Sequence, residues 1–158
     1  FLTSCTEIFT ETTAVQLERK EISTAKVEFL KYPITVFIGI AGPLWGQVFF
    51  CFEEDTARRT AGRMMKAPTP PAEFDEESIS AIAELGNMIT GRALKTFEEM
   101  GLDLILTPPT VFRAEGFQCY FSIPTVNIRF TCNFGEVVIS VGLIETTDPP
   151  TLPIIEKK

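Results

Sequence analysis

Two polar side chains stand in an otherwise apolar stretch, and their types could take part in chemistry. Glu84 and Asn87 lie in "ESISAIAELGNMITGRALKTFEEMG", residues 77–101, which has the pattern of one long helix. Residues three apart on a helix are neighbours on its surface. A carboxylate binds cations, and an amide both donates and accepts hydrogen bonds. The pair is therefore a candidate contact centre, although Glu-x-x-Asn alone is common on helices and usually incidental.

The surroundings of this pair favour a docking surface. At about 100° per residue, one helix face is apolar and should meet the core, and the opposite face carries the pair. Gly91 costs about 1 kcal/mol of helix stability relative to alanine and would leave a hollow beside Asn87. A solvated face would carry more Lys and Glu than the flanks do. The predicted core stripe is Ile79, Ile82, Leu85, Gly86, Ile89, Ala93, Phe97 and Met100; the outer row is Ser80, Glu84, Asn87 and Gly91, flanked by Ala81, Ala83, Met88, Thr90 and Leu94.

Composition narrows the possible functions. The chain has 158 residues, enough for one domain with a core, and its net charge of -7 argues against a nucleic-acid partner. It contains no histidine, which excludes Ser-His-Asp and Cys-His catalysis by this chain alone. The cysteines form no CxxC pair and no clustered metal site, so we expect reduced, mostly buried thiols in a cytoplasmic protein. They are Cys5, Cys51, Cys119 and Cys132.

The first half of the chain predicts a helix, three strands and a second helix. Residues 1–15 have helical spacing of apolar residues, and the chain opens inside this helix without Met or a basic leader, as a fragment would. Residues 15–30 alternate as an exposed strand or hairpin arm. The uncharged run 32–52 is long enough to suggest a membrane span, but its Pro and Gly residues favour two buried strands joined at "AGPLWG". Residues 53–65 begin acidic and end basic, as suits a helix dipole.

The second half predicts the long helix and an antiparallel sheet. The helix should run from about Asp75 to Met100, with Gly101 as its C-terminal cap. In "TVNIRFTCNF", residues 125–134, the apolar residues alternate with polar ones, and "GEVVISVGL" repeats the pattern after a tight turn at 133–136. The fold class is therefore α+β, an antiparallel sheet packed against long helices. We expect a single domain over residues 1–145 and a proline-rich tail over 146–158.

The long helix and the segment after it resemble a known family. "SAIAELGNMITGRAL" followed by "LTPPT" is similar to the CheC/CheX/FliY family of chemotaxis phosphatases. Their signature is Asp or Ser, then Glu, then Asn, then Pro at fixed spacing. Ser80, Glu84, Asn87 and Pro109 stand at these places, with 21 residues between Asn87 and Pro109. The strand pair and helix predicted at residues 39–65 are also similar to the family. A single copy of the motif in a chain of this length resembles the CheX branch, whose members are homodimers with one site per subunit.

The resemblance implies an enzyme that hydrolyses the aspartyl phosphate of a CheY-type receiver domain. Asn87 would orient the attacking water, and Glu84 would pair with the receiver's lysine. Ser80, Ala83, Met88 and Gly91 would contact the receiver, and Pro109 would be structural. No cofactor is expected on this chain, because the receiver would bring its own Mg²⁺. The alternative is a non-catalytic receiver-binding or flagellar-switch-like module, since a fold does not guarantee activity.

Overall fold

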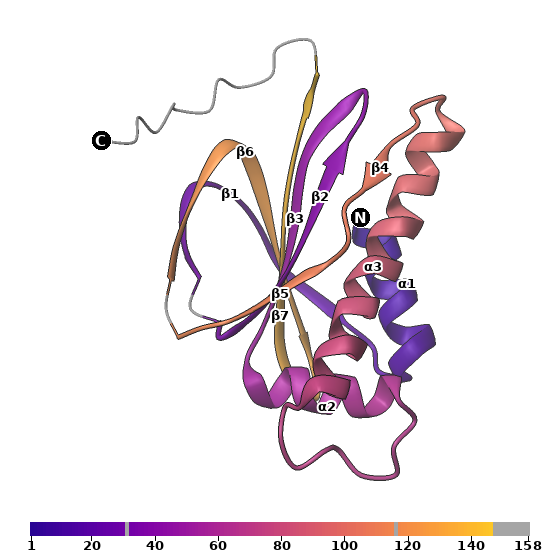
Figure 1. Ribbon diagram of the computed structural model, residues 1–158, viewed down its shortest axis with the longest axis vertical. Coiled ribbons are helices and arrows are strands. Elements are labelled where there is room, and N and C mark those ends of the chain that lie inside the picture. The colour runs from indigo at the N-terminus through magenta and orange to yellow at the C-terminus, as the bar shows by residue number, and fades with distance from the viewer. Residues whose placement is uncertain (31, 116, 147–158) are drawn as a thin grey trace.

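A seven-stranded antiparallel sheet with helices on one face forms the protein (Figure 1). The computed structural model describes residues 1–30, 32–115 and 117–146. The sheet order is β1-β6-β7-β3-β2-β4, and β5 also pairs with β2. The elements are α1 (Leu2–Thr13), β1 (Glu18–Leu30), β2 (Ile34–Ala41), β3 (Leu44–Phe52), α2 (Glu54–Met64), α3 (Glu76–Glu99), β4 (Ile105–Leu106), β5 (Thr110–Arg113), β6 (Phe117–Cys132) and β7 (Gly135–Glu145). The predicted α+β class is confirmed.

The two apolar strands predicted from residues 32–52 form the β2–β3 hairpin at the centre of the core. Ile34 pairs with Phe52 at one end and Ile40 with Gly46 at the other. Alternate residues of the hairpin lie in different apolar clusters, because successive side chains of a strand point to opposite faces. Phe50 belongs to the main core under the helices, whereas Phe49 and Cys51 belong to a smaller cluster on the other face. In the described part of the chain, no helix is long and apolar enough to cross a membrane.

β6 and β7 form the second predicted hairpin. Cys132 pairs with Gly135, which leaves Asn133 and Phe134 as a two-residue turn inside the predicted range 133–136. Of the apolar residues predicted on the covered side of β6, Ile128 and Phe130 are buried. Val126 is the exception, with 38% of its surface exposed. β1 pairs with β6 and forms one edge of the sheet. Of the two alternatives predicted for residues 15–30, an exposed strand or a hairpin arm, the structure shows a strand.

The long helix α3 begins and ends where its capping residues predict. Asp75 is the N-cap, and its carboxylate accepts hydrogen bonds from the Ser78 amide at 2.9 Å and the Ser78 hydroxyl at 2.8 Å. At the other end Gly101 has a φ of +84°, and its amide donates to the Glu98 carbonyl while that of Leu102 donates to Phe97. This is the Schellman arrangement, which requires a left-handed residue and so favours glycine. Both ends of α3 are therefore fixed by capping hydrogen bonds.

The Asp75 cap makes the stability of the protein sensitive to acid. Its hydrogen bonds from Ser78 lower the pKa of Asp75 below its usual value. A carboxylate whose pKa is lowered in the folded state stabilises the protein at pH values above its unfolded-state pKa of about 4. This stabilisation is lost as the pH falls through the lower, folded-state pKa. Asp75→Ala should therefore unfold at lower urea than the wild type at pH 7, and the difference should shrink at pH 3. Glu73→Ala, on an exposed side chain before the cap, is the control; an equal loss there would contradict this role.

The sequence predicts a proline-rich tail over residues 146–158. Of these, residues 147–158 lie outside the described residues. The division into a domain over 1–145 and this tail stays a prediction. β7 ends at Glu145, opposite Leu44 of β3. At Thr146 the amide donates to the Pro43 carbonyl at 3.1 Å, and the hydroxyl donates to the Gly42 carbonyl. The chain therefore leaves the described fold beside the β2–β3 turn.

Candidate functional site

The outer face of α3 carries the residues predicted to form the site. Ser80, Glu84 and Gly91 are exposed, and Asn87 is half-buried between Glu84 and Gly91. The flanking side chains predicted to contact a partner, Ala83 and Met88, are half-buried on either side of this row. Helical periodicity thus brings all six onto one surface, as predicted. We call the surface formed by Ser80, Ala83, Glu84, Asn87, Met88 and Gly91 the α3 surface.

The two polar side chains at its centre are available to a partner. Within the described residues, the Glu84 carboxylate and the Asn87 amide make no hydrogen bond or ion pair with another residue. Gly91 adds open space, because a Cβ built there would meet no atom within 4 Å. An exposed carboxylate and amide on a helix, beside a residue with no side chain, form a contact point for a protruding group.

The opposite face of the same turn fixes the helix on the sheet. Gly86, which lies between Glu84 and Asn87 in the sequence, is buried. A Cβ at Gly86 would lie 3.2 Å from Phe50 Cδ2 and 3.2 Å from Val36 Cγ1, closer than ordinary van der Waals contact. Glycine therefore lets α3 approach β2 and β3 closely. The polar pair is held on a rigid support rather than on a loop, which favours precise positioning.

One side of the α3 surface is bordered by α1, through an ion pair that the sequence did not predict. Arg92 donates to both carboxylate oxygens of Glu11, at 2.9 and 3.2 Å, and lies 3.6 Å from Glu7. The Glu11 carboxylate holds the pKa of the Arg92 guanidinium above its usual value. Arg92 and Glu11 are 81 residues apart, so no local pattern could indicate their pairing. The contact joins α1 to α3 directly beside Gly91.

Three predictions for side chains of the long helix were wrong. Thr90 and Leu94 were predicted on the outer flank, but both are buried. The Thr90 hydroxyl donates to the Gly86 carbonyl at 2.7 Å, and Leu94 joins the main core, against which Leu104 and Leu106 also pack. Met100 was predicted in the core stripe but is 69% exposed, because the helix ends at Glu99 and the chain turns away at the Gly101 cap. The other members of the core stripe are buried or half-buried as predicted: Ile79, Ile82, Leu85, Gly86, Ile89, Ala93 and Phe97.

Pro109 has a structural position. It is half-buried and directly precedes β5, which begins at Thr110 and contacts α3. Proline lacks an amide donor and is tolerated at the start of an edge strand. Its place before β5 agrees with the structural role expected for it.

The side chains at the centre of the α3 surface are a carboxylate and an amide, and the described chain adds few other reactive groups. The chain has no histidine, and in the described residues no group of three or more Cys, Asp or Glu side chains could hold a metal ion. Burial raises the pKa of the Cys5 thiol to about 12, so it is no nucleophile at neutral pH. Cys51 is also buried and Cys132 half-buried, which confirms the prediction of reduced thiols for these three.

Comparison with known proteins shows which family the chain is similar to. The family model "Chemotaxis phosphatase CheX" matches residues 34–131. A Thermotoga maritima protein, described as CheY-P phosphatase CheX, is 33% identical over 97 residues; the match covers 60% of this chain and 62% of that protein, less than two thirds of its length. The structure of a CheC-like superfamily protein from a Shewanella species has a TM-score of 0.81 at 21% identity, covering 90% of this chain and 94% of that chain. A CheX from Borrelia burgdorferi, solved as a CheX-CheY-BeF3-Mg²⁺ complex, has a TM-score of 0.69 at 19% identity, covering 91% and 95%.

The fold is thus that of the CheC-like proteins, an antiparallel sheet with three helices. Within this class the match to the family model covers more than half of the chain and includes the whole of α3. The chain belongs to the CheX chemotaxis phosphatase family. The resemblance inferred from Ser80, Glu84, Asn87 and Pro109 is confirmed at the level of the family.

Proposed function

We propose that the protein is a phosphatase that hydrolyses the aspartyl phosphate of a CheY-type receiver domain. The observation that carries this proposal is the position of Glu84 and Asn87 on the outer face of α3 in a CheX-family protein. Within the described part of the chain, neither side chain has a hydrogen-bond or ion-pair partner. In the proposed complex the α3 surface enters the receiver's phosphorylation site. The receiver supplies the aspartyl phosphate, the Mg²⁺ and a lysine, and this chain supplies no metal.

Asn87 has the chemistry required to position water. Hydrolysis of an acyl phosphate needs a water oxygen in line with the phosphorus; the new P–O bond forms as the bond to the aspartyl oxygen breaks, and the carboxylate leaves. The Asn87 carboxamide oxygen accepts a hydrogen bond from the water, while its NH₂ group donates to a phosphoryl oxygen. Phosphoryl transfer depends mainly on positioning and electrostatics, so a neutral amide is sufficient.

Glu84 serves binding in this proposal. It lies one helical turn before Asn87, so a receiver lysine that pairs with its carboxylate would place the phosphoryl group near the amide. An ion pair that loses its water in the middle of an interface contributes to specificity and to slow dissociation. Ser80, Ala83 and Met88 would contact the receiver around this pair.

The relatives support the proposed substrate. The Thermotoga relative is described as a CheY-P phosphatase, and the Borrelia relative was solved in complex with CheY, BeF3 and Mg²⁺. Phosphatase activity is tested by following phosphate release from a phosphorylated CheY-type receiver with Mg²⁺, with and without this protein. Faster release in its presence supports the proposal. Binding without acceleration would instead identify a receiver-binding module, the alternative that the sequence left open.

Gly91→Ala should separate stability from activity. The added methyl group meets no atom within 4 Å, so the substitution should raise the free energy of unfolding by about 1 kcal/mol through helix propensity. The same methyl group would fill the space beside Asn87 and should raise the KM for the phosphorylated receiver several-fold. Urea unfolding and steady-state phosphate release measure the two effects. Thr96→Ala, on an exposed position of the same helix, is the control that should leave the KM unchanged.

We also propose that the protein is a cytoplasmic homodimer, as predicted. Within the described residues β1 pairs with β6 only, so one backbone edge of a 13-residue strand is unpaired. Such an edge favours pairing with another chain, and a two-fold axis would join two sheets into one. Sedimentation equilibrium tests this state: a mass of one chain at micromolar concentration would contradict it.

A further inference from the structure

A hollow of about 340 Å³ lies between the second half of α2, the loop that leads to α3 and the β6–β7 turn. Arg59 and Arg63 line it from α2, Pro68 and Pro70 from the loop, and Phe134 from the turn. α2 and this loop form one end of the molecule (Figure 1). Sites for small molecules have volumes of about 300–1,000 Å³, so the hollow can hold a small ligand. It shares no lining residue with the α3 surface.

Both walls of the hollow are held in place. A Cβ at Gly62 would lie 3.1 Å from Pro71 Cδ, so glycine allows the loop to pack closely against α2. Arg58 Nη1 donates to the Pro71 carbonyl at 2.7 Å. On the other wall, the Thr56 hydroxyl donates to the Phe134 carbonyl at 2.8 Å. The hollow is therefore a formed site and does not require a loop to close over it.

The end of α2 directs no free carbonyl of its last turn against an anion. Lys66 has a φ of +53°, and its amide donates to the Arg63 carbonyl at 3.1 Å. The Ala67 amide donates to the Gly62 carbonyl at 3.0 Å. These two bonds form a Schellman motif, in which the left-handed residue is usually glycine. Lysine at this position instead adds a positive charge beside the lining residue Ala67.

Positive charge is concentrated around the hollow. Residues 55–66 contain three arginines, one lysine and one carboxylate, a net charge of +3 in a chain whose net charge is -7. The carboxylate is Asp55, which accepts from Arg58 at 2.5 Å and from Arg59 Nε at 2.9 Å. The two guanidinium groups hold the pKa of Asp55 below its usual value. Asp55 therefore occupies only the Nε of Arg59 and leaves its other donors available.

Arg63 is the cation that remains fully available. Among the described residues its guanidinium makes no ion pair or hydrogen bond, and it lies over the Phe134 ring, 6.0 Å from the centroid. This contact orients the planar guanidinium without using its N–H groups. Glu136, the carboxylate that follows in the turn, accepts from the Tyr32 hydroxyl at 2.9 Å and from Arg129 at 3.4 Å.

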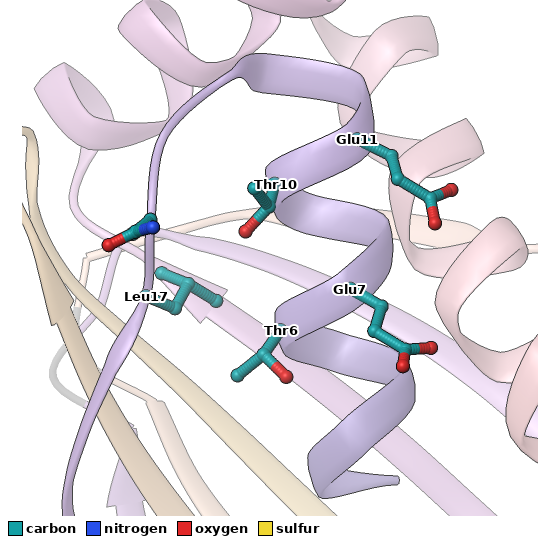
Figure 2. Close-up of a pocket in the computed structure, with 6 residues that line it drawn as sticks. Thr6, Glu7, Thr10, Glu11 and Leu17 are labelled. Carbon is teal, nitrogen blue, oxygen red and sulfur yellow. The ribbon is translucent and has the colours of Figure 1, made fainter.

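A larger hollow beside α1 has the opposite charge. Its volume is about 520 Å³, and its lining includes Thr6, Glu7, Thr10 and Glu11 (Figure 2). Figure 2 shows the two carboxylates pointing away from the two threonine hydroxyls. Arg92 of α3 binds both carboxylates and is not part of the lining. Of these two hollows, the one at α2 is therefore the one that suits an anion.

We propose that the hollow at α2 binds a phosphate monoester of a small organic molecule. The N–H groups of a guanidinium match the spacing of two phosphate oxygens, so Arg59 and Arg63 would hold the phosphate. Two cations also match a phosphate monoester, whose charge near neutral pH is close to −2. Phe134, Pro68 and Pro70 would contact the organic group. The inference does not depend on the proposed phosphatase activity.

Titration of the full chain with phenyl phosphate at pH 7.5 and constant ionic strength tests the proposal. In ¹H–¹⁵N NMR spectra the amide signals of Arg59, Arg63, Ala67 and Phe134 should shift and saturate. Inorganic phosphate should shift the same signals with several-fold weaker affinity, because it cannot bury apolar surface. Benzoate, with one charge, should also bind more weakly. Shifts that do not saturate would overturn the site, and benzoate binding as tight as that of phenyl phosphate would overturn its assignment to phosphate.

Two variants of one arginine and a matched control locate the binding. Arg63→Ala should raise the Kd for phenyl phosphate about tenfold, because hydrogen bonds to a charged group are lost. Arg63→Lys keeps the charge without the paired donors and should lie between the two. Arg19→Ala, on an exposed position of β1, removes the same charge elsewhere and should leave the Kd unchanged. An unchanged Kd in Arg63→Ala, or an equal rise in Arg19→Ala, would overturn the proposal; the spectrum of each variant reports whether it is folded.

Discussion

Replacement of Asn87 by alanine is expected to lower the rate constant of receiver dephosphorylation by about two orders of magnitude. The substitution removes the carboxamide, whose oxygen can accept a hydrogen bond from a water while its NH₂ group donates to a phosphoryl oxygen. The side chain is half-buried and makes no hydrogen bond within the described chain, so its loss should not disturb the fold. The measurement is single-turnover phosphate release at saturating enzyme.

The binding arm of this experiment decides between positioning and docking. Affinity for the receiver complexed with beryllofluoride and Mg²⁺ should change little in Asn87→Ala, because the Glu84 carboxylate and the surrounding contacts remain. Ser80→Ala, exposed on the same row, is the control that should keep most of the rate. Wild-type rates in Asn87→Ala would remove Asn87 from the mechanism. Lost binding together with lost rate would assign it to docking instead.

The grouping of the candidate site residues on one helix face could be predicted from the sequence because its determinants are local. Glu84, Asn87 and Gly91 lie within two turns of one helix, so helical periodicity alone puts them on one face. The helix boundaries were predictable for the same reason, since Asp75 and Gly101 act on neighbouring amides and carbonyls. The structure adds that the central pair has no other partner in the described chain.

The surroundings of the site could not be predicted, because they depend on distant parts of the chain. Arg92 meets Glu11 only after α1 packs beside α3. Leu94 looks like a flanking residue on a helical wheel, but it is buried in a core that also receives Leu104 and Leu106. The 38% exposure of Val126 is likewise not predicted by the alternation of β6. Periodicity predicts the face of an element and not the neighbours that cover it.

Replacement of Phe50 by alanine is expected to lower the free energy of unfolding by about 3–5 kcal/mol. Phe50 is 1% exposed, lies in the main core and supports α3 at Gly86. Its removal leaves a cavity directly under the turn that carries Glu84 and Asn87. Urea unfolding measures the loss. Phe112→Ala is the matched control: the ring is 44% exposed, so the loss should be about 1 kcal/mol or less.

A double-mutant cycle with Gly86 tests the contact itself. In the wild type, an alanine Cβ at Gly86 would lie 3.2 Å from both Phe50 and Val36, so crowding should cancel or outweigh the roughly 1 kcal/mol that alanine adds to helix stability. With Phe50 truncated, one of the two crowding side chains is gone and the methyl group enters the cavity. Gly86→Ala should therefore stabilise the Phe50→Ala variant, with a coupling energy on the order of 1 kcal/mol. Additive effects of the two substitutions would show that α3 does not rest on Phe50, and the rigid support for Glu84 and Asn87 would then have to come from elsewhere in the sheet.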